Sequence, residues 1–201
     1  MNLGSIRTHF KALLNRSDIT DALANTFIDQ SIARIQRTLR IPSMEKTHTY
    51  TFTAATTSVL LPNDFIEGID MSYASHTLDR LPMGELLDRK STGESGNPHF
   101  FAREGGSFLI TPVPSSGNLI LNYYAQFTAM TSDSDENSLA AVGSDLLIYG
   151  ALTYAGDYYL DERQGLFESK FAQFMMEIQD QAYDAEITGS LQAIRPAYLY
   201  H

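Results

Sequence analysis

The 201-residue sequence contains no cysteine, no tryptophan and no long apolar run. Without cysteine there are no disulfides, no thiolate nucleophiles and no cysteine-ligated zinc sites, and a reducing compartment suits the chain. No stretch approaches the roughly 18 to 20 apolar residues of a membrane-spanning helix, so we expect no membrane partner. Residues 1–16 lack a long apolar core and a small-residue cleavage motif, and we therefore expect no signal peptide.

Basic residues are also few. The chain has 14 Lys and Arg against 24 Asp and Glu, a formal net charge of -10. Proteins that hold duplex DNA need a basic surface, because release of counterions from the phosphates supplies most of the affinity. We therefore predict no sequence-specific nucleic acid binding. An acidic wall that repels the DNA backbone would still let DNA pass without holding it.

The two ends of the chain have helical periodicity. Apolar residues recur every three or four positions from Leu3 to Leu14, which predicts a helix. A second helix is predicted from Thr20, as N-cap, to the region before Pro42, which stops it. Beyond an acidic loop at 133–137, interpreted as a solvated linker, we predict an antiparallel pair of helices at about 142–159 and 161–187. The second of these has one apolar stripe and is too long for its neighbours to cover, the stripe being Leu166, Phe167, Phe171, Phe174, Met175, Ile178 and Ala182.

The middle of the chain alternates with period two, which is typical of strands. Predicted strands cover 47–53, 58–61, 65–73, 98–103, 107–111 and 118–127, with one short helix at 81–89. The strand at 58–61 is expected to return from 47–53 across a turn. The fold class is therefore α+β. Residues 1–46 and 128–190 are predicted to form a helical bundle, 47–127 an inserted small antiparallel β-domain, and 191–201 an extended C-terminal arm.

No motif in the sequence predicts an enzyme, a cofactor or a metal site. The histidines lack metal-ligand spacing, and no G-x-S-x-G or phosphate-binding glycine motif occurs. We assign no catalysis to the carboxylates at Asp64, Glu67 and Asp70, and no calcium site to the 133–137 loop. Aromatic residues of the last two helices are interpreted as core and subunit packing rather than as a base-stacking platform; they are Tyr149, Tyr154, Tyr158, Tyr159, Phe167, Phe171 and Phe174.

An ordered set of motifs resembles the adaptor proteins of tailed phages, especially short-tailed ones. The motifs in the sheet region are GNPHFF at 96–101, G-x-FLI-x-P-x-P at 106–114 and L-x-L-x-YY at 119–124. Others are IARIQR-x-LR at 32–40, LP-x-DF at 61–65, DLLIYGAL at 145–152 and DER at 161–163. The resemblance runs in order over roughly residues 1 to 190, and the C-terminal segment departs from it.

The resemblance implies a non-enzymatic structural protein of the virion, made in the host bacterial cytoplasm. It implies a head-to-tail connector: a twelve-copy ring, or dodecamer, that docks under the portal protein and extends the channel for DNA packaging and ejection. The ring would seat the tail nozzle protein and often the tail fibres. A long helix with an uncovered apolar face agrees with this, because head-to-tail contacts between copies close into rings.

Interface residues are expected in two places. In the C-terminal arm they are Arg195, Tyr198 and Tyr200, although plain disorder is an equal alternative for the arm without the resemblance. On the second helix they are Arg34, Arg37 and Arg40, which have an alternative as partners of the helix C-terminal dipole.

Two other functions remain open. One is a tail-completion or neck protein that never touches the portal. The other is a cell-envelope hydrolase of the tail, which requires paired carboxylates or a metal cluster in a cleft.

Overall fold

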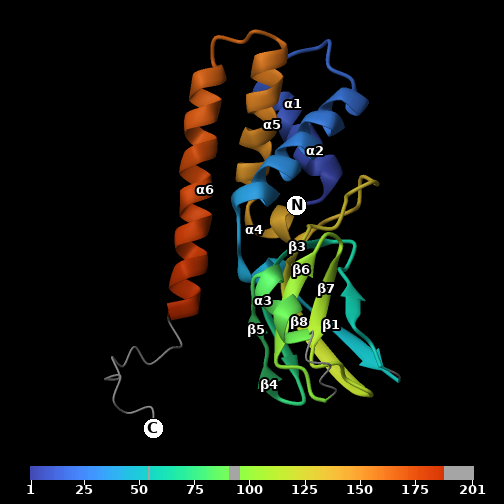
Figure 1. The fold of residues 1–201 in the computed structure, drawn as a ribbon. Helices are drawn as coiled ribbons and strands as arrows, with labels where there is room; N and C mark the ends of the chain where they lie inside the picture. The colour runs from blue at the N-terminus through green and yellow to red at the C-terminus, as the bar shows by residue number, and fades with distance from the viewer. Residues whose placement is uncertain (54, 91–95, 188–201) are drawn as a thin grey trace. The chain divides into compact units, whose positions relative to one another are not determined.

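A computed structural model of the chain describes residues 1–53, 55–90 and 96–187, with side chains to residue 184 (Figure 1). The chain divides into two compact units, a helical unit from residues 1–43 and 127–201 and a β-unit from residues 44–126. The α+β class is confirmed, because helices from both ends of the chain pack together and β-sheets lie in the inserted segment.

The helical unit contains five described helices: α1 (Leu3–Leu14), α2 (Asp21–Thr38), α4 (Ser138–Val142), α5 (Ser144–Tyr158) and α6 (Gln164–Ile187). Four were predicted from apolar spacing. The Thr20 side chain accepts a hydrogen bond from the Leu23 amide at 3.2 Å, so the predicted N-cap of α2 is confirmed. The short helix α4 was missed, because five residues are too few to show helical periodicity.

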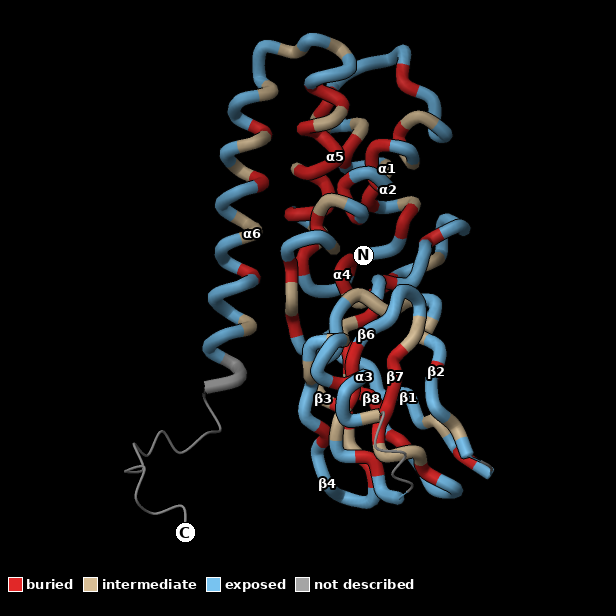
Figure 2. The backbone as a smooth tube through the Cα atoms, viewed as in Figure 1, coloured by how far each residue is buried: buried red, intermediate tan, exposed pale blue. Residues whose placement is uncertain are grey.

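Helix α5 lies at the centre of the helical unit and packs against α1, α2, α4 and α6. Nine of its fifteen residues are buried, so Figure 2 shows it red on several sides. At Gly150 three helices come very close. A Cβ added there would lie 2.1 Å from Ser31 Oγ on α2 and 3.0 Å from the Phe171 ring on α6. The fully buried Ser31 hydroxyl donates to the Leu147 carbonyl at 3.1 Å, which satisfies it.

The acidic loop at 133–137 connects the last strand of the β-unit to α4 and exposes the Asp133 and Glu136 side chains, as expected of a solvated linker, but it is also bound to α1. The Arg7 guanidinium donates to both carboxylate oxygens of Asp133 at 2.8 Å. The amides of Leu3 and Gly4 donate to the carbonyls of Asp135 and Asp133, at 2.9 and 3.0 Å. The loop therefore accepts hydrogen bonds from amides of the first turn of α1, groups that have no partner within the helix.

The joint between α5 and α6 is held by Asp161 and Arg163. The Asp161 amide donates back to the Gly156 carbonyl at 2.8 Å, which closes the end of α5. The Arg163 guanidinium donates to the Asp161 carboxylate at 2.7 Å and to the Leu14 carbonyl of α1 at 3.0 Å. Hydrogen bonds from the Arg163 side chain and amide lower the pKa of Asp161 to about 2.

The β-unit has two sheets instead of the single antiparallel sheet that was predicted. The first has the order β1-β8-β3-β4, and the second β2-β7-β6-β5. Strand β2 pairs with β7 and not with β1, so the expected return of 58–61 on 47–53 was wrong. Strands β5 and β6 are parallel. The bounds are β1 Glu45–Phe52, β2 Ser58–Leu60, β3 Phe65–Tyr73, β4 His76–Thr77, β5 Asp79–Arg80, β6 Phe100–Glu104, β7 Ser107–Thr111 and β8 Gly117–Ala125.

Apolar side chains from both sheets form one core. Phe65 stacks on Tyr123 of the first sheet and meets Phe108 of the second edge-on, with ring centroids 5.7 and 5.8 Å apart. Helix α3 (Met83–Lys90) lies against β6 and β7, where its Leu86 is buried with Ala102 and Leu109. A 3₁₀ turn, η1 (Pro42–Met44), precedes β1. The second sheet is thus covered on both faces, by α3 and by the first sheet.

We predict that Gly150→Ala lowers the free energy of unfolding by about 1–3 kcal/mol, the usual cost of an overpacked core, because the added methyl clashes with Ser31. Gly165→Ala in α6 is the matched control. A Cβ there has open space around it, and alanine favours helix by up to about 1 kcal/mol. Urea unfolding of both variants measures the difference. An unchanged Gly150→Ala variant would contradict the close packing.

We predict that the Asp161 carboxylate makes stability depend on pH between its ordinary pKa and about 2. Its pKa is lowered in the folded state, so its contribution is fully present above the ordinary value and is lost as the pH falls through about 2. Asp161→Asn therefore flattens the rise of the unfolding free energy with pH over this window. Arg163→Gln flattens it in part, because it removes the guanidinium hydrogen bonds that lower the pKa of Asp161 and keeps the one from the backbone amide of residue 163. Urea titrations across the window test this, and an Asp161→Asn variant with the wild-type slope would refute it.

Candidate interaction sites

Helix α6 is covered on one side only, by α5. Figure 2 shows pale blue, exposed residues along its whole described length. Phe167, Phe171 and Ile178 form the buried stripe, while Leu166 is 58% exposed and lies outside it, contrary to the prediction. Met176 is 63% exposed. The expectation that this helix is too long for its neighbours to cover is confirmed.

A groove of about 690 Å³ runs between α2 and α6, and we call it the α6 groove. It is lined by Arg34, Arg37, Thr38, Glu168, Phe171, Ala172, Met175, Met176 and Gln179. Inside it the Arg34 guanidinium donates to both oxygens of the Glu168 carboxylate, with Nη1 2.9 Å from Oε2. The same guanidinium lies 4.3 Å from the centre of the Phe171 ring. These contacts fix the α2–α6 spacing, and the hydrogen bonds from Arg34 lower the pKa of Glu168.

The structure separates the six residues that were expected at interfaces. Arg34 has its internal partner in Glu168, and Arg37 is exposed on the wall of the α6 groove. The Arg40 guanidinium donates to the carbonyls of Gln36 and Leu39, at 3.0 and 2.7 Å, which is the contact that the helix-dipole alternative describes. The remaining three, in the C-terminal arm, lie outside the described residues; they are Arg195, Tyr198 and Tyr200.

A smaller apolar pocket of about 200 Å³ lies farther along α6. It is lined by Ile41, Pro42, Ser43, Val142, Ile178, Gln181 and Ala182. Val142, 52% exposed at the end of α4, contributes an apolar surface to it. Together with the exposed Met176, this pocket leaves apolar area on the flank of α6 that a single copy does not bury. Exposed apolar area of this kind is typical of protein contact sites.

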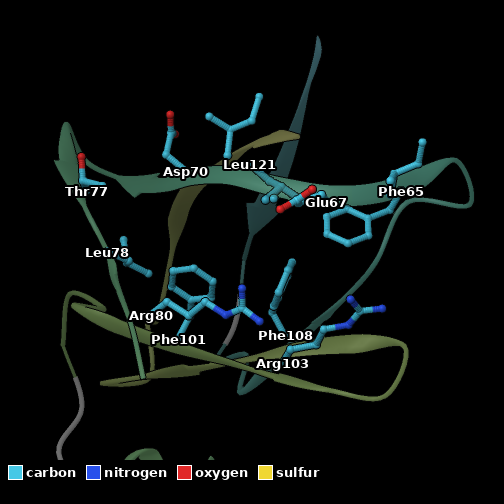
Figure 3. A pocket seen from close by; sticks show the side chains of 13 residues that line it. Phe65, Glu67, Asp70, Thr77, Leu78, Arg80, Phe101, Arg103, Phe108 and Leu121 are labelled. Carbon is cyan, nitrogen blue, oxygen red and sulfur yellow. The ribbon is translucent and has the colours of Figure 1, made fainter. Parts of the chain in front are cut away.

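A third hollow, of about 480 Å³, opens between the two sheets of the β-unit, and we call it the sheet pocket (Figure 3). Its apolar walls include Phe65, Phe101, Phe108 and Leu121. The guanidinium groups of Arg80 and Arg103 lie among these rings, on the side of the second sheet (Figure 3). Sequence reasoning missed this site, because it combines residues from six strands. One feature of the sequence could have indicated the site: Gly68 lies inside a predicted strand, and a glycine there often marks a bulge or the close approach of a ligand.

Two of the three carboxylates at 64–70 are held by hydrogen bonds within the β-unit. Asp64 accepts hydrogen bonds from Lys46 at 2.7 Å and from the Tyr123 hydroxyl at 2.9 Å. Burial opposes ionisation of Asp64, but these hydrogen bonds outweigh it and lower its pKa, while burial and the Asp64 contact raise the pKa of Tyr123 to about 12. Asp70 accepts from Asn122 Nδ2 at 2.9 Å. Each of these two carboxylates therefore has a structural hydrogen-bond partner.

Two searches of the described residues bear on the other functional classes. Among the side chains that the structure describes, those of residues 1–53, 55–90 and 96–184, no group of three or more His, Asp or Glu is arranged to hold a metal ion. Over the same ranges, no helix is long and apolar enough to cross a membrane. What the described chain does offer is two concave surfaces with apolar walls and arginine side chains, an arrangement that fits the binding of other protein chains.

These features describe two compact units, each with a concave surface that has apolar walls and arginine side chains. Comparison with protein families matches residues 1–194 to the SU10 adaptor protein family. The chain belongs to this family of phage head–tail adaptors, and its role is structural rather than catalytic. A comparison with curated proteins finds no match. The family resemblance stated from the sequence motifs is thereby confirmed.

Proposed function

We propose that the chain assembles into a twelve-copy ring between the portal protein and the tail nozzle, extends the DNA channel and seats tail components, including fibres. Membership of the SU10 adaptor family carries the proposal, since adaptors act by binding other virion proteins. The net charge of -10 supports a wall along which DNA slides without being held. The working location is the head–tail junction of the virion.

The open flank of α6 supports a ring made of identical copies. In a ring each copy uses two different surfaces, one facing each neighbour, so a concave surface on one copy receives a convex surface of the next. The α6 groove and the adjoining apolar pocket supply such a concave surface, and Met176 is exposed within it. Burial of this apolar area contributes roughly 25 cal/mol per Å² to association.

We assign different binding partners to the two units. We assign the contacts between copies and with the portal to the helical unit, together with Arg37 in the α6 groove. We assign the C-terminal arm, with Arg195, Tyr198 and Tyr200, to the portal as a clasp. The β-unit is assigned to the tail components. A neck or tail-completion protein that never touches the portal is the competing function.

Met176→Asp is predicted to weaken assembly of copies by about tenfold or more, since a buried charge without a partner costs at least about 1.4 kcal/mol. Leu166→Asp is the matched control, because it lies on the same helix with similar exposure but outside the α6 groove. Native mass spectrometry with the portal ring of the same particle counts the bound copies. Twelve copies for the wild type and the control support the ring. Equal losses in both variants would contradict the α6 groove as the contact.

Removal of the residues after Ser190 is predicted to abolish binding to the portal ring while the fold persists. The described helices end at Ile187, so the truncation leaves their contacts in place. Native mass spectrometry measures portal binding, and circular dichroism melting measures the fold. If the truncated chain binds the portal ring with unchanged affinity, the arm is not the portal clasp. If the full chain does not bind the portal ring, the neck-protein function is favoured.

A further inference from the structure

Strand β1 lies at one edge of the first sheet, where β8 is its one partner among the described strands. The pairing continues over the eight residues Glu45–Phe52 without a shift in register. Natural proteins usually shorten an edge strand or interrupt it with a bulge or a proline, because an open edge recruits other strands. Strand β1 contains no proline and no bulge, and it is one of the longer strands of the β-unit.

The register shows which backbone groups of β1 point to its free side. The Gln126 amide donates to the Asp64 carbonyl at 2.7 Å, on the β3 side of β8. Successive residues of a strand direct their backbone groups to opposite sides, so the odd-numbered residues of β8 face β1. These are paired with the even-numbered residues of β1. The backbone groups of the odd-numbered residues of β1 therefore point away from β8. We call these residues the β1 edge; they are Glu45, Thr47, Thr49 and Thr51.

The β1 edge is accessible. All four of its residues are exposed. Within the described part of the chain, the backbone of β1 has hydrogen-bond partners in β8 alone. Lys46 does not protect the edge, because its side chain lies on the other face of the sheet and its amine is held by the Asp64 carboxylate at 2.7 Å. Amides and carbonyls that alternate along an open edge match an extended backbone, which adds to the sheet as a further strand.

A second copy of this chain does not match the β1 edge. Pairing of two β1 strands would use the same surface on both copies and close as a dimer, whereas a ring needs two different surfaces on each copy. The other edge strands are too short, since β4 and β5 have two residues each and β2 has three. In addition, the Leu60 carbonyl of β2 accepts a hydrogen bond from the Tyr50 hydroxyl at 2.6 Å. The matching strand therefore comes from a different protein.

The side chains beside the edge define the chemistry of that strand. The strands of the first sheet contain one lysine and three acidic residues, which are Glu45, Glu67 and Asp70. Opposite charges on adjacent strands attract, so a basic residue next to Glu45 is favoured over an acidic one. On the other face, the rings of His48 and Tyr50 lie 4.5 Å apart. Aromatic or β-branched residues of the added strand pack best against this pair.

We infer that the β1 edge binds an extended segment of a tail component as an added strand of the first sheet. The segment has no proline opposite residues 45–51, carries aromatic or β-branched residues beside His48 and Tyr50, and places Lys or Arg beside Glu45. Main-chain hydrogen bonds supply the affinity, and the alternating side chains supply the selectivity. This inference rests on the proposed function, because there the β-unit is assigned to the tail components.

Amide hydrogen exchange of the full chain, followed by NMR, tests the site. In the free protein we expect the Lys46 and His48 amides to exchange at least about tenfold more slowly than those of Thr47 and Thr49, because only the first two bond to β8. The probe is the peptide acetyl-TVTYTVK-amide, whose lysine lies beside Glu45 when it adds antiparallel to β1. At saturation it should slow the Thr47 and Thr49 amides by about tenfold or more. If these two amides exchange at the same rate with and without the peptide, the inference is wrong.

A proline variant blocks the edge without breaking the sheet. Thr49→Pro removes an amide that points to solvent, a position where edge strands accept proline, and should weaken peptide binding about tenfold. Thr49→Ala keeps the amide and is the matched control, expected to bind like the wild type. The peptide N-methylated at its third and fifth residues loses the same hydrogen bonds without any change in the protein. Undiminished binding of this peptide would overturn the inference even if Thr49→Pro failed to fold.

A second peptide tests the charge of the partner. In acetyl-TVTYTVE-amide a glutamate replaces the lysine beside Glu45, and we expect it to bind about threefold more weakly, the scale of an exposed charge pair. Added salt should reduce this difference, because it screens exposed charges. Equal or tighter binding of the glutamate peptide would overturn the partner chemistry stated above.

The same samples separate this inference from the proposed function. Peptide binding requires only the folded chain, whereas ring formation is scored with the portal by native mass spectrometry. Thr49→Pro is expected to join the portal ring like the wild type and to lose the tail nozzle. A chain that joins the portal ring but does not bind the peptide loses the β1 edge as a site and keeps the adaptor role. A chain that binds the peptide but never joins the portal keeps the site and loses the ring proposal.

Discussion

Three helices meet at Gly150, and the arrangement of the helical unit depends on how closely they approach there. Ser31 of α2 and Phe171 of α6 occupy the space that any side chain at this position would need. The approach brings α2 and α6 together on the side of α5 where Gly150 lies, and the Ser31 hydroxyl keeps its hydrogen bond to the Leu147 carbonyl. Because α2 and α6 lie this close, the Arg34 side chain can reach Glu168, and this contact sets the width of the α6 groove.

In each unit, some apolar side chains are left uncovered by neighbouring helices or strands, and these side chains form its interaction surface. Helix α5 is enclosed by four other helices, whereas α6 packs mainly against α5, contacts α2 through Arg34, and leaves apolar side chains along one flank. In the β-unit the two bulges of β3 lie in the segment of that strand that lines the sheet pocket. An assembly protein needs such surfaces, because apolar area left exposed by one chain is available to drive contact with the next.

Apolar spacing predicted the helices α1, α2, α5 and α6 and most strands, because burial of one face imposes the same period wherever the chain packs. The same reasoning failed where a contact joins residues distant in sequence. The attachment of the acidic loop to α1 was missed because its partners, Arg7 and the amides of α1, lie more than 120 residues away. Strand β2 was paired with its neighbour in sequence, whereas it pairs with β7 across about 50 residues.

The sequence by itself determined the class of the fold, the helical ends with a β-rich insertion, and the family, through motifs distributed in order along the chain. Its composition also excluded sites that depend on cysteine and argued against a basic surface that holds DNA. Only the tertiary structure decided that Arg34 has an internal partner, that Leu166 lies outside the buried stripe, and that Arg80 and Arg103 meet three phenylalanine rings in one pocket. The physical reason is that periodicity reports which face of an element is buried, while partners are chosen by long-range packing.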